Sequence, residues 1–294
     1  MVTLTALGGN QQWLDGGAMF GNAPRAVWEK WVAVDSKNRI PLACRSLLIE
    51  DQNVRILCEA GIGAFFPPHL ADRYGVTPLT NLLPTRLREH GLDENDIDYV
   101  ILSHLHFDHA GGLLPSYADR VSGGDRLLFP RALYIVSQKA WERASRPHPR
   151  DQASFIPEIK ALLEASGRLL LLDEGTGIPG LDRFSFFETH GHTPGHLHTV
   201  YRGNHRSVVF AGDLIPGIPW IHLPITMGYD RFAELVIDEK SKFYERALAE
   251  NWLLFFTHDS KYAMASIAKD EKGRYKPHTT EIWEEDQLVR YALS

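Results

Sequence analysis

Cysteine and long apolar runs are scarce in this sequence. Only two of the 294 residues are cysteines, Cys44 and Cys58, and each stands in an apolar stretch. Two cysteines cannot form the disulfide framework of a small secreted protein, and they suit a reducing compartment. No apolar run approaches the roughly 20 residues of a membrane-spanning helix, and the N-terminal segment has no basic part followed by an apolar core. We therefore expect a cytoplasmic protein without a membrane partner.

Positive charge is scarce as well. Lysine and arginine together number 31, against 37 aspartates and glutamates, which gives a formal net charge of -6. No dense basic stretch occurs, so the electrostatic footprint of a nucleic-acid-binding protein is missing and we expect no nucleic-acid partner. The composition, 44% hydrophobic and 23% charged, is that of a globular protein rather than a disordered or fibrous one.

Short apolar runs rich in β-branched and aromatic residues alternate with helical patterns. Runs of this kind, bounded by turn residues, predict strands, and their mixture with helices predicts the α/β class. No repeat, low-complexity segment or linker divides the chain, so we expect residues 1–294 to form a single domain. Strands are expected at 46–50, 54–60, 97–104, 133–137, 168–173, 184–190, 207–213 and 252–258, and helices at about 82–90, 138–145, 156–166 and 231–250.

The stretch "SHLHFDHAGG", residues 103–112, places three histidines and an aspartate close together. In an extended segment successive side chains alternate, so His104 and His106 point the same way and can chelate one ion. The glycines that follow let the backbone turn, which would carry Asp108 and His109 toward an adjacent position. One loop can thus begin two metal sites.

Each ion needs at least three protein ligands, and the chain offers more at three other predicted strand ends. "THGHTPGHLH" (189–198) presents four histidines, "VVFAGDL" ends in Asp213 and Leu214, and "LLFFTHD" contains His258. Functional groups gather at the carboxyl ends of strands in open α/β folds. A histidine taken alone is more often a hydrogen-bonded structural residue, and this applies to His190, His192, His198, His205 and His222.

The motifs H-x-H-x-D-H, G-H-T-P-G-H, A-G-D and a late strand ending in histidine occur in the order of the metallo-β-lactamase superfamily, which the chain resembles from about residue 45 to 260. The resemblance implies an αββα sandwich of two mixed β-sheets flanked by helices. It also implies two divalent metal ions, for which zinc is the expectation and iron, manganese or cobalt would fit. By this resemblance the ligands are His104, His106 and His196 for one ion, Asp108, His109 and His258 for the other, and Asp213 as the bridge, with His192 in a supporting role.

Two features set this chain apart within the superfamily. Many relatives carry a D-T-G motif near the end of an early strand, where this chain has "CEAGIG" with Glu59, whose expected role is to support the ligand loop. The site has no cysteine ligand, and both Asp213 and His109 are present, which argues against β-lactam hydrolysis.

Two neighbouring divalent ions can share a water, lower its pKa to about 7 and generate a hydroxide nucleophile. The expected reaction is therefore hydrolysis of an ester-like bond in a small-molecule substrate, with Asp108 orienting the hydroxide and passing its proton to the leaving group. "SHLHFDHAGG" is most similar to the loop of N-acyl homoserine lactonases, although the tyrosine that those enzymes often carry three residues after the bridging aspartate is Pro216 here. We expect a lactone or a small carboxylic ester. The alternatives are a phosphotriesterase or phosphodiesterase, a thioester hydrolase, and a mononuclear-iron sulfur dioxygenase.

Two segments are candidates for the substrate pocket. Residues 13–43 are glycine-rich and then aromatic, and they could form a lid in which Met19, Phe20 and Trp28 face an acyl chain. The equal alternative is a packing or dimerisation segment in a homodimer. The second segment follows the expected bridging aspartate and contributes Trp220, His222 and Tyr229.

Overall fold

The computed structural model describes residues 2–284 and 291–293, and within these residues the strands form two large sheets and one hairpin. The first large sheet has the order β15 (Tyr291–Leu293), β1 (Val2–Leu7), β4 (Ser46–Asp51), β5 (Val54–Cys58), β6 (Tyr99–Ile101), β7 (Leu133–Ser137) and β8 (Leu169–Leu172). The second has the order β14 (Tyr275–Glu284), β13 (Tyr262–Lys269), β12 (Trp252–Phe255), β11 (Ser207–Phe210), β10 (His196–Arg202) and β9 (Phe184–Thr189).

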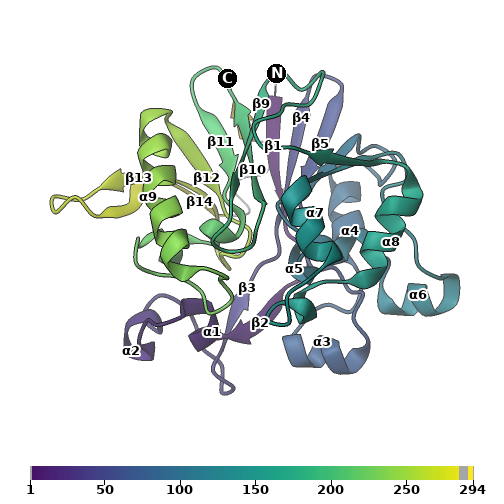
Figure 1. Ribbon diagram of the computed structural model, residues 1–294, viewed down its shortest axis with the longest axis horizontal. Helices are drawn as coiled ribbons and strands as arrows, with labels where there is room; N and C mark the ends of the chain where they lie inside the picture. The colour runs from purple at the N-terminus through teal and green to yellow at the C-terminus, as the bar shows by residue number, and fades with distance from the viewer. Residues whose placement is uncertain (1, 285–290, 294) are drawn as a thin grey trace.

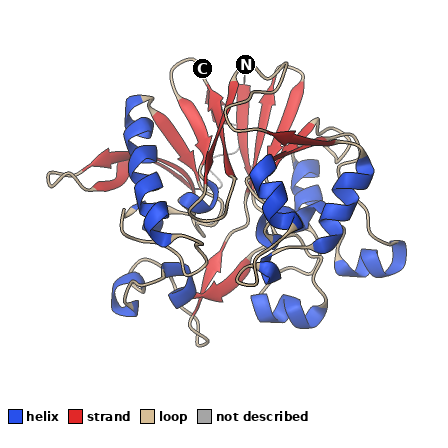
Figure 2. Ribbon diagram, in the orientation of Figure 1, coloured by secondary structure: helices blue, strands red, loops and turns tan. Residues whose placement is uncertain are grey.

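The two large sheets pack face to face, as Figures 1 and 2 show. Alternate side chains of a strand point to opposite faces. In β4, Leu47 and Ile49 enter the core between the sheets, whereas Leu48 faces the outer layer. In β12, Leu253 lies between the sheets and Leu254 on the outer side. Both faces of each strand are therefore apolar, which explains why these segments read as continuous hydrophobic runs.

Helices cover the outer faces of both sheets. The long helix α9 (Ala233–Ala249) packs Val236 and Phe243 onto the second sheet. The first sheet is covered by α4 (Leu82–Glu89), α7 (Gln138–Ser145) and α8 (Pro157–Ser166), which contribute Leu87, Trp141 and Leu163 to one apolar cluster. The layers are thus helix, sheet, sheet, helix, and the predicted αββα sandwich is confirmed.

The predicted segments agree with most of the architecture. Each of the eight predicted strands overlaps a strand of the structure, and the four predicted helices match within about two residues at each end, with 138–145 reproduced in full. The strands that the sequence patterns missed are β1, β2 (Gln12–Asp15), β3 (Arg39–Leu42), β10, β13, β14 and β15, and the missed helices include α3 (Pro68–Tyr74) and α6 (Tyr117–Gly123). Strand β10 was missed because its first residues belong to the histidine-rich motif that had been interpreted as a turn.

The strand order brings the functional loops to one edge. Strands β5, β6 and β7 are parallel to one another, and β11 is parallel to β12, so the loops that follow these strands leave their sheets at matching ends. The N-terminal hairpin of β2 (Gln12–Asp15) and β3 (Arg39–Leu42), with α1 (Gly16–Phe20) and α2 (Arg25–Trp28), lies across this edge (Figure 1). Among the described residues no helix has the length and apolarity needed to cross a membrane.

Candidate metal centre

The histidine-rich loop after β6 reaches the edge between the sheets. His104 and His106 lie in irregular backbone with their ring centroids 4.3 Å apart, and the short helix α5 (Phe107–Ala110) begins directly after His106 and carries Asp108 and His109. Gly111 and Gly112 begin a short 3-10 helix, Gly111–Leu113, directly after α5. They pack against the backbone of residues 60–62, where a Cβ atom would overlap carbonyl groups, so only glycine allows this close approach.

One group of imidazoles comes from two loops. A ligand atom from each of His104, His106 and His192 lies within 4.8 Å of the other two. Nε2 of His192 is 3.4 Å from Nδ1 of His106, and all three side chains are buried. Nε2 of His104 is buried and has no hydrogen-bond partner among the described residues. Buried polar atoms are nearly always paired, so this convergence of nitrogen lone pairs fits a metal ion.

A second group combines Asp108, His109 and His258, again with ligand atoms within 4.8 Å of one another. The Nε2 atoms of His109 and His258 are 3.2 Å apart. Oδ2 of Asp108 lies 3.5 Å from Nε2 of His258. His258 follows β12, and its Nε2 reaches the centre from the second sheet, whereas the other two residues come from the first.

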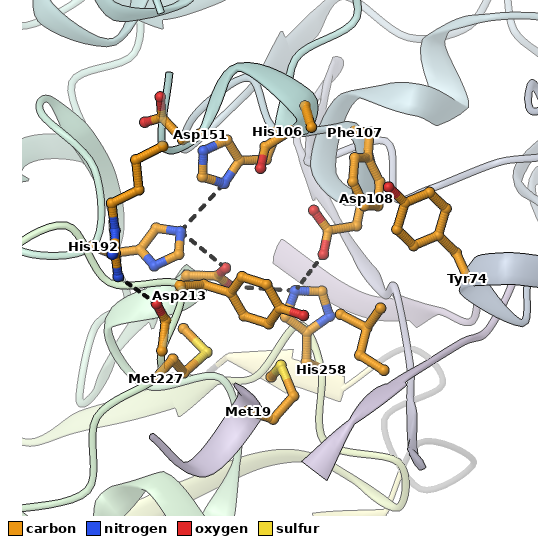
Figure 3. Close-up of a pocket in the computed structure, with 16 residues that line it drawn as sticks. Met19, Tyr74, His106, Phe107, Asp108, Asp151, His192, Asp213, Met227 and His258 are labelled. Atoms are coloured by element: carbon orange, nitrogen blue, oxygen red, sulfur yellow. Dashed lines mark hydrogen bonds and ion pairs between the residues drawn. The ribbon is translucent and has the colours of Figure 1, made fainter. Parts of the chain in front are cut away.

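Asp213 lies between the two groups. One carboxylate oxygen, Oδ1, is 3.3 Å from Nε2 of His109 and 3.2 Å from Nε2 of His258. The other oxygen, Oδ2, is 3.2 Å from Nε2 of His192 (Figure 3). The two oxygens therefore face different groups, which is the placement that a shared carboxylate requires.

The remaining ring nitrogens of four histidines face oxygen atoms. When an oxygen accepts the Nδ1 hydrogen, the lone pair is left on Nε2, which is how proteins orient metal-binding imidazoles. Hydrogen bonds hold three of these Nδ1 atoms, to Ala43 O for His258 (2.6 Å), Asp230 Oδ1 for His192 (2.9 Å) and Ser103 Oγ for His104 (2.9 Å). The Nδ1 atom of the fourth, His109, faces Glu59 Oε2 at 3.4 Å without a hydrogen bond.

Glu59 supports two parts of the ligand loop at once. Its side chain is fully buried, and Oε1 accepts a 2.7 Å hydrogen bond from the backbone N–H of Ser103 while Oε2 faces His109. The residue has a φ of 69°, in the left-handed region that non-glycine residues rarely adopt. The Glu59 carboxylate therefore contacts the ligand loop through Ser103, in the supporting position that the sequence predicted for it.

The electrostatics of the metal-free chain divide the histidines into two sets. Burial lowers the pKa of His104 and of His106 well below the ordinary value. Burial opposes the charge on His109 and His258 too, but Asp213 outweighs it, and the pKa of each is raised well above the ordinary value. Burial favours neutral Asp213, yet the neighbouring imidazoles hold its pKa well below its usual range. Positive charge is thus favoured around Asp213.

The assignment within "GHTPGH" needs correction. His196 was the predicted ligand, but its Nε2 accepts a 3.0 Å hydrogen bond from the backbone N–H of Asp213, and its Nδ1 is 3.3 Å from Nε2 of His198. His192 instead joins His104 and His106. His196 is the first residue of β10, and the strand directs its side chain to the backbone of Asp213. His192 lies in the loop before β10, and its side chain reaches His104 and His106.

A pocket of about 370 Å³ opens in front of these groups. Tyr74 and Phe107 lie beside Asp108, whereas Asp151 lies beyond His106 and His192 (Figure 3). The apolar lining comes from Leu14, Met19, Tyr74, Phe107, Met227 and Tyr229, and the polar lining away from the metal-binding groups comes from Arg150, Asp151 and Ser154. A ligand here would therefore meet an apolar surface and a polar one.

The structure divides the predicted pocket residues. Met19 and Tyr229 line the pocket, but Phe20, Trp28, Trp220 and His222 do not. Phe20 is buried between Trp28 and Trp220, with ring centroids at 5.3 and 4.7 Å, so these three rings form a core beside the pocket. His222 stacks on Trp31 at 5.1 Å, outside this pocket. Trp220 and His222 line a second cavity, which also contains His258.

Two supporting residues were missed from the sequence. Nε2 of Gln12, in β2, donates a 2.7 Å hydrogen bond to Oδ2 of Asp108. The carboxylate of Asp230 accepts from Nδ1 of His192 at 2.9 Å and from the backbone N–H of Met227 at 2.7 Å. No local pattern marks Gln12, because its contact is 96 residues away in sequence. Asp230 directly precedes a predicted helix, which offered a weak signal.

The sandwich and the clustered imidazoles and carboxylates at its edge define an αββα protein with a metal-binding centre. Residues 39–258 match the family described as the metallo-beta-lactamase superfamily, and the chain belongs to that superfamily.

Three known proteins are similar to this chain. Over 183 residues it is 26% identical to the probable metallo-hydrolase YflN of Bacillus subtilis (strain 168), a match that covers 58% of each protein, so the chain spans less than two thirds of that relative. A probable metal-dependent hydrolase from Staphylococcus aureus superposes with a TM-score of 0.83 at 25% identity, covering 94% of this chain and 97% of the other. AidC, a dizinc quorum-quenching lactonase, shares the fold with a TM-score of 0.71 at 19% identity and covers 94% of both chains.

Proposed function

We propose that this protein is a dinuclear metal-dependent hydrolase that cleaves an ester-like bond, a lactone or a small carboxylic ester. The observation that carries the proposal is the position of Asp213, whose two oxygens face different groups of potential ligands at the base of the pocket. One ion would not reach all of these atoms, because metal–ligand distances are about 2.0–2.2 Å. The similarity to a probable metal-dependent hydrolase and to a probable metallo-hydrolase supports the proposed hydrolase activity.

The residues present fit two ions. His104, His106 and His192 would hold one, Asp108, His109 and His258 the other, and Asp213 would contact both. The donor set of imidazoles and carboxylates suits zinc, and it also suits iron, manganese or cobalt. When bound, two such ions would activate a water as the nucleophile and polarise the carbonyl of the substrate.

The protein residues contribute orientation and proton transfer. Asp108 lines the pocket, and the hydrogen bond from Gln12 holds its Oδ2, so the carboxylate is fixed where it can take a proton and pass it to the leaving oxygen. The apolar lining, including Met19 and Phe107, excludes water from one part of the pocket and strengthens the electrostatic interactions within it.

The proposed substrate is a small molecule, because a pocket of about 370 Å³ has the volume of a small-molecule site. We further propose that the protein works in the cytoplasm and uses no nucleic-acid or membrane partner, in line with its two buried free cysteines and its net negative charge. We also propose that residues 1–294 form a single domain and that the protein forms a homodimer. Sedimentation velocity tests the homodimer.

The test is a substrate panel with protein whose metal content has been measured. Lactones, aryl esters, thioesters and phosphotriesters should be compared, and hydrolysis of lactones or aryl esters is the expected result. Oxygen consumption with a persulfide and no hydrolysis would replace the proposal with a dioxygenase, and efficient turnover of phosphotriesters alone would change the substrate class.

A further inference from the structure

The polar wall of the pocket carries more positive than negative charge. Arg143 and Arg231 face Asp151, whose Oδ2 accepts from Arg143 at 2.7 Å and lies 3.8 Å from Nε of Arg231. Arg150, the preceding residue, lines the pocket together with Asp151. The carboxylate of Asp230, the residue before Arg231, already accepts hydrogen bonds from His192 and from the backbone N–H of Met227. The three guanidinium groups thus exceed the nearby carboxylates.

Arg231 is the least satisfied of the three arginines. Its side chain is 9% exposed, and its Nε and Nη1 atoms are buried without a hydrogen-bond partner among the described residues. Burial, together with the charges of Arg143 and Arg150, lowers the pKa of Arg231 against the opposing effect of Asp151. A buried guanidinium that lacks full pairing is costly, and an additional negative charge nearby would offset that cost.

Arg150 is the arginine that a ligand would touch. It lines the pocket, and its Nη2 donates a 2.7 Å hydrogen bond to the backbone carbonyl of Gly228, which holds the guanidinium in place at this wall. Ser154, on the same wall, adds a hydroxyl group. Guanidinium groups bind carboxylates and phosphates through paired hydrogen bonds, and a pre-oriented guanidinium loses less freedom on binding.

We propose that the substrate carries an oxyanion, a carboxylate or a phosphate-type group, on the side of the scissile ester that faces His106 and His192, and that Arg150 binds this group with Arg143 and Arg231 behind it. This inference rests on the proposed ester hydrolysis and narrows its substrate class. Neutral acyl lactones would then be poorer substrates than acidic esters, because they place no negative charge beside the three arginines of this wall.

The test compares matched aryl esters that differ in one group. The neutral 4-nitrophenyl pentanoate is set against the mono-4-nitrophenyl ester of glutaric acid, which ends in a carboxylate, and against the corresponding phosphonate. Each is assayed with the metal-loaded wild-type protein and with Arg150→Gln, Arg150→Lys and Arg231→Gln. Arg146→Gln is the matched control, since Arg146 is an exposed arginine of the same segment that does not line the pocket.

Wild-type protein should favour at least one anionic ester over the neutral ester by about 10-fold or more in kcat/KM. Arg150→Gln should lower kcat/KM for that ester by about 10- to 100-fold, mainly through KM, as expected for a lost hydrogen bond to a charged group. The loss for the neutral ester should be at least about 5-fold smaller than the loss for the anionic ester, and Arg150→Lys should recover part of the loss for the anionic ester. Preference for the carboxylate or for the phosphonate supports the proposal and identifies the group.

Three results would overturn the inference: no preference in the wild-type protein, equal losses for neutral and anionic esters in Arg150→Gln, or an equal effect of Arg146→Gln. A binding measurement separates this inference from the proposed reaction. Calorimetry with 4-(4-nitrophenoxy)butanoate, an ether that cannot be hydrolysed, should show weaker binding to Arg150→Gln than to wild type. If no ester or lactone is hydrolysed but this difference is found, the proposed reaction fails and the anion site stands.

Discussion

Nε2 of His109 and Nε2 of His258 approach to 3.2 Å although the two residues follow strands of different sheets, β6 and β12. Glu59 faces Nδ1 of the first histidine and the carbonyl of Ala43 contacts Nδ1 of the second, so both Nε2 atoms present lone pairs when the rings are neutral. Two lone pairs repel each other unless a proton or a metal cation lies between them. The pair is therefore held together by positive charge, which makes the stability of the protein depend on what supplies that charge.

Removal of metal by a chelator should lower the thermal stability. A ligand present at 100 times its dissociation constant stabilises the folded state by about 2.7 kcal/mol, which corresponds to roughly 4 °C in the melting temperature of a 294-residue chain, whose entropy of unfolding is about 2.1 cal/mol/K per residue. Calorimetry before and after treatment with EDTA, followed by zinc, measures the loss and its recovery. An unchanged melting temperature in a sample shown to have lost its metal would contradict a structural role for the ions.

His192→Ala and His196→Ala should separate the two histidines of the "GHTPGH" motif. Because His192 lies with His104 and His106 and His196 does not, His192→Ala should remove close to one ion per chain. His196→Ala should retain binding with an affinity reduced by about 10- to 100-fold, because it acts through the backbone of Asp213. Elemental analysis and competition with a zinc dye measure both, and His205→Ala, at an exposed histidine outside the motif, is the control. The opposite order would restore the assignment made from the sequence.

Gln12→Glu should impair catalysis more than Gln12→Ala. The amide of Gln12 donates to Asp108 at 2.7 Å, and a glutamate there would place a second carboxylate against Asp108 in a buried position. We expect kcat to fall by about 10-fold or more for the alanine variant and further for the glutamate variant. Steady-state kinetics with the ester found in the substrate panel measures the effect, and equal rates in both variants would argue that Gln12 does not position Asp108.

Met19→Ala and Phe20→Ala, which are neighbours in sequence, should have different consequences. Met19 lines the pocket and is also buried in the same apolar cluster as Phe20, so its truncation should alter the preference for acyl-chain length and lower the free energy of unfolding by about 2–5 kcal/mol. Phe20 is buried between two tryptophans, so its truncation should reduce the free energy of unfolding by about 3–5 kcal/mol. Urea unfolding and a series of ester chain lengths provide the two readouts. A change in chain-length preference for Phe20→Ala with unchanged stability would return Phe20 to the pocket.

Lys240 should make the stability depend on pH above neutrality. Burial lowers the pKa of Lys240 to about 7, although its ammonium group donates to the carbonyls of His222, Leu223 and Ile225. Between pH 7 and the unfolded value near 10.5, the unfolded chain binds more protons at this residue than the folded chain does. The free energy of unfolding therefore rises with pH in that window through this group.

Lys240→Met is the matched variant for this effect. It keeps the apolar stem but has no titratable amine, so its free energy of unfolding should rise less between pH 7 and 9 than that of the wild-type protein. Urea unfolding at several pH values measures the difference in slope. Parallel curves for the two proteins would show that the folded protein holds Lys240 charged through its three carbonyl contacts.

The sequence by itself determined the layers of the fold and most members of the metal centre. Strands β4, β5, β11 and β12 are apolar on both faces, a pattern that local composition records directly, and helix α9 shows its period along the chain. The motif at 104–109 and the strand-terminal Asp213 and His258 were likewise visible, because each ligand motif is contiguous and each follows a recognisable strand.

Tertiary structure decided what local pattern cannot encode. His192 and His196 have the same side chain within one motif, and only the direction imposed by β10 determines which one faces the centre. Phe20 and Met19 were equally apolar candidates, and both are buried in one cluster with Trp220, which lies 200 residues away from Phe20 in sequence. Only the folded chain shows that Phe20 is enclosed between two tryptophans whereas Met19 also reaches the wall of the pocket. The contacts of Gln12 with Asp108 and of Asp230 with His192 also join distant segments. Burial and hydrogen bonding are properties of the assembled sheets, so these roles arise only when the chain has folded.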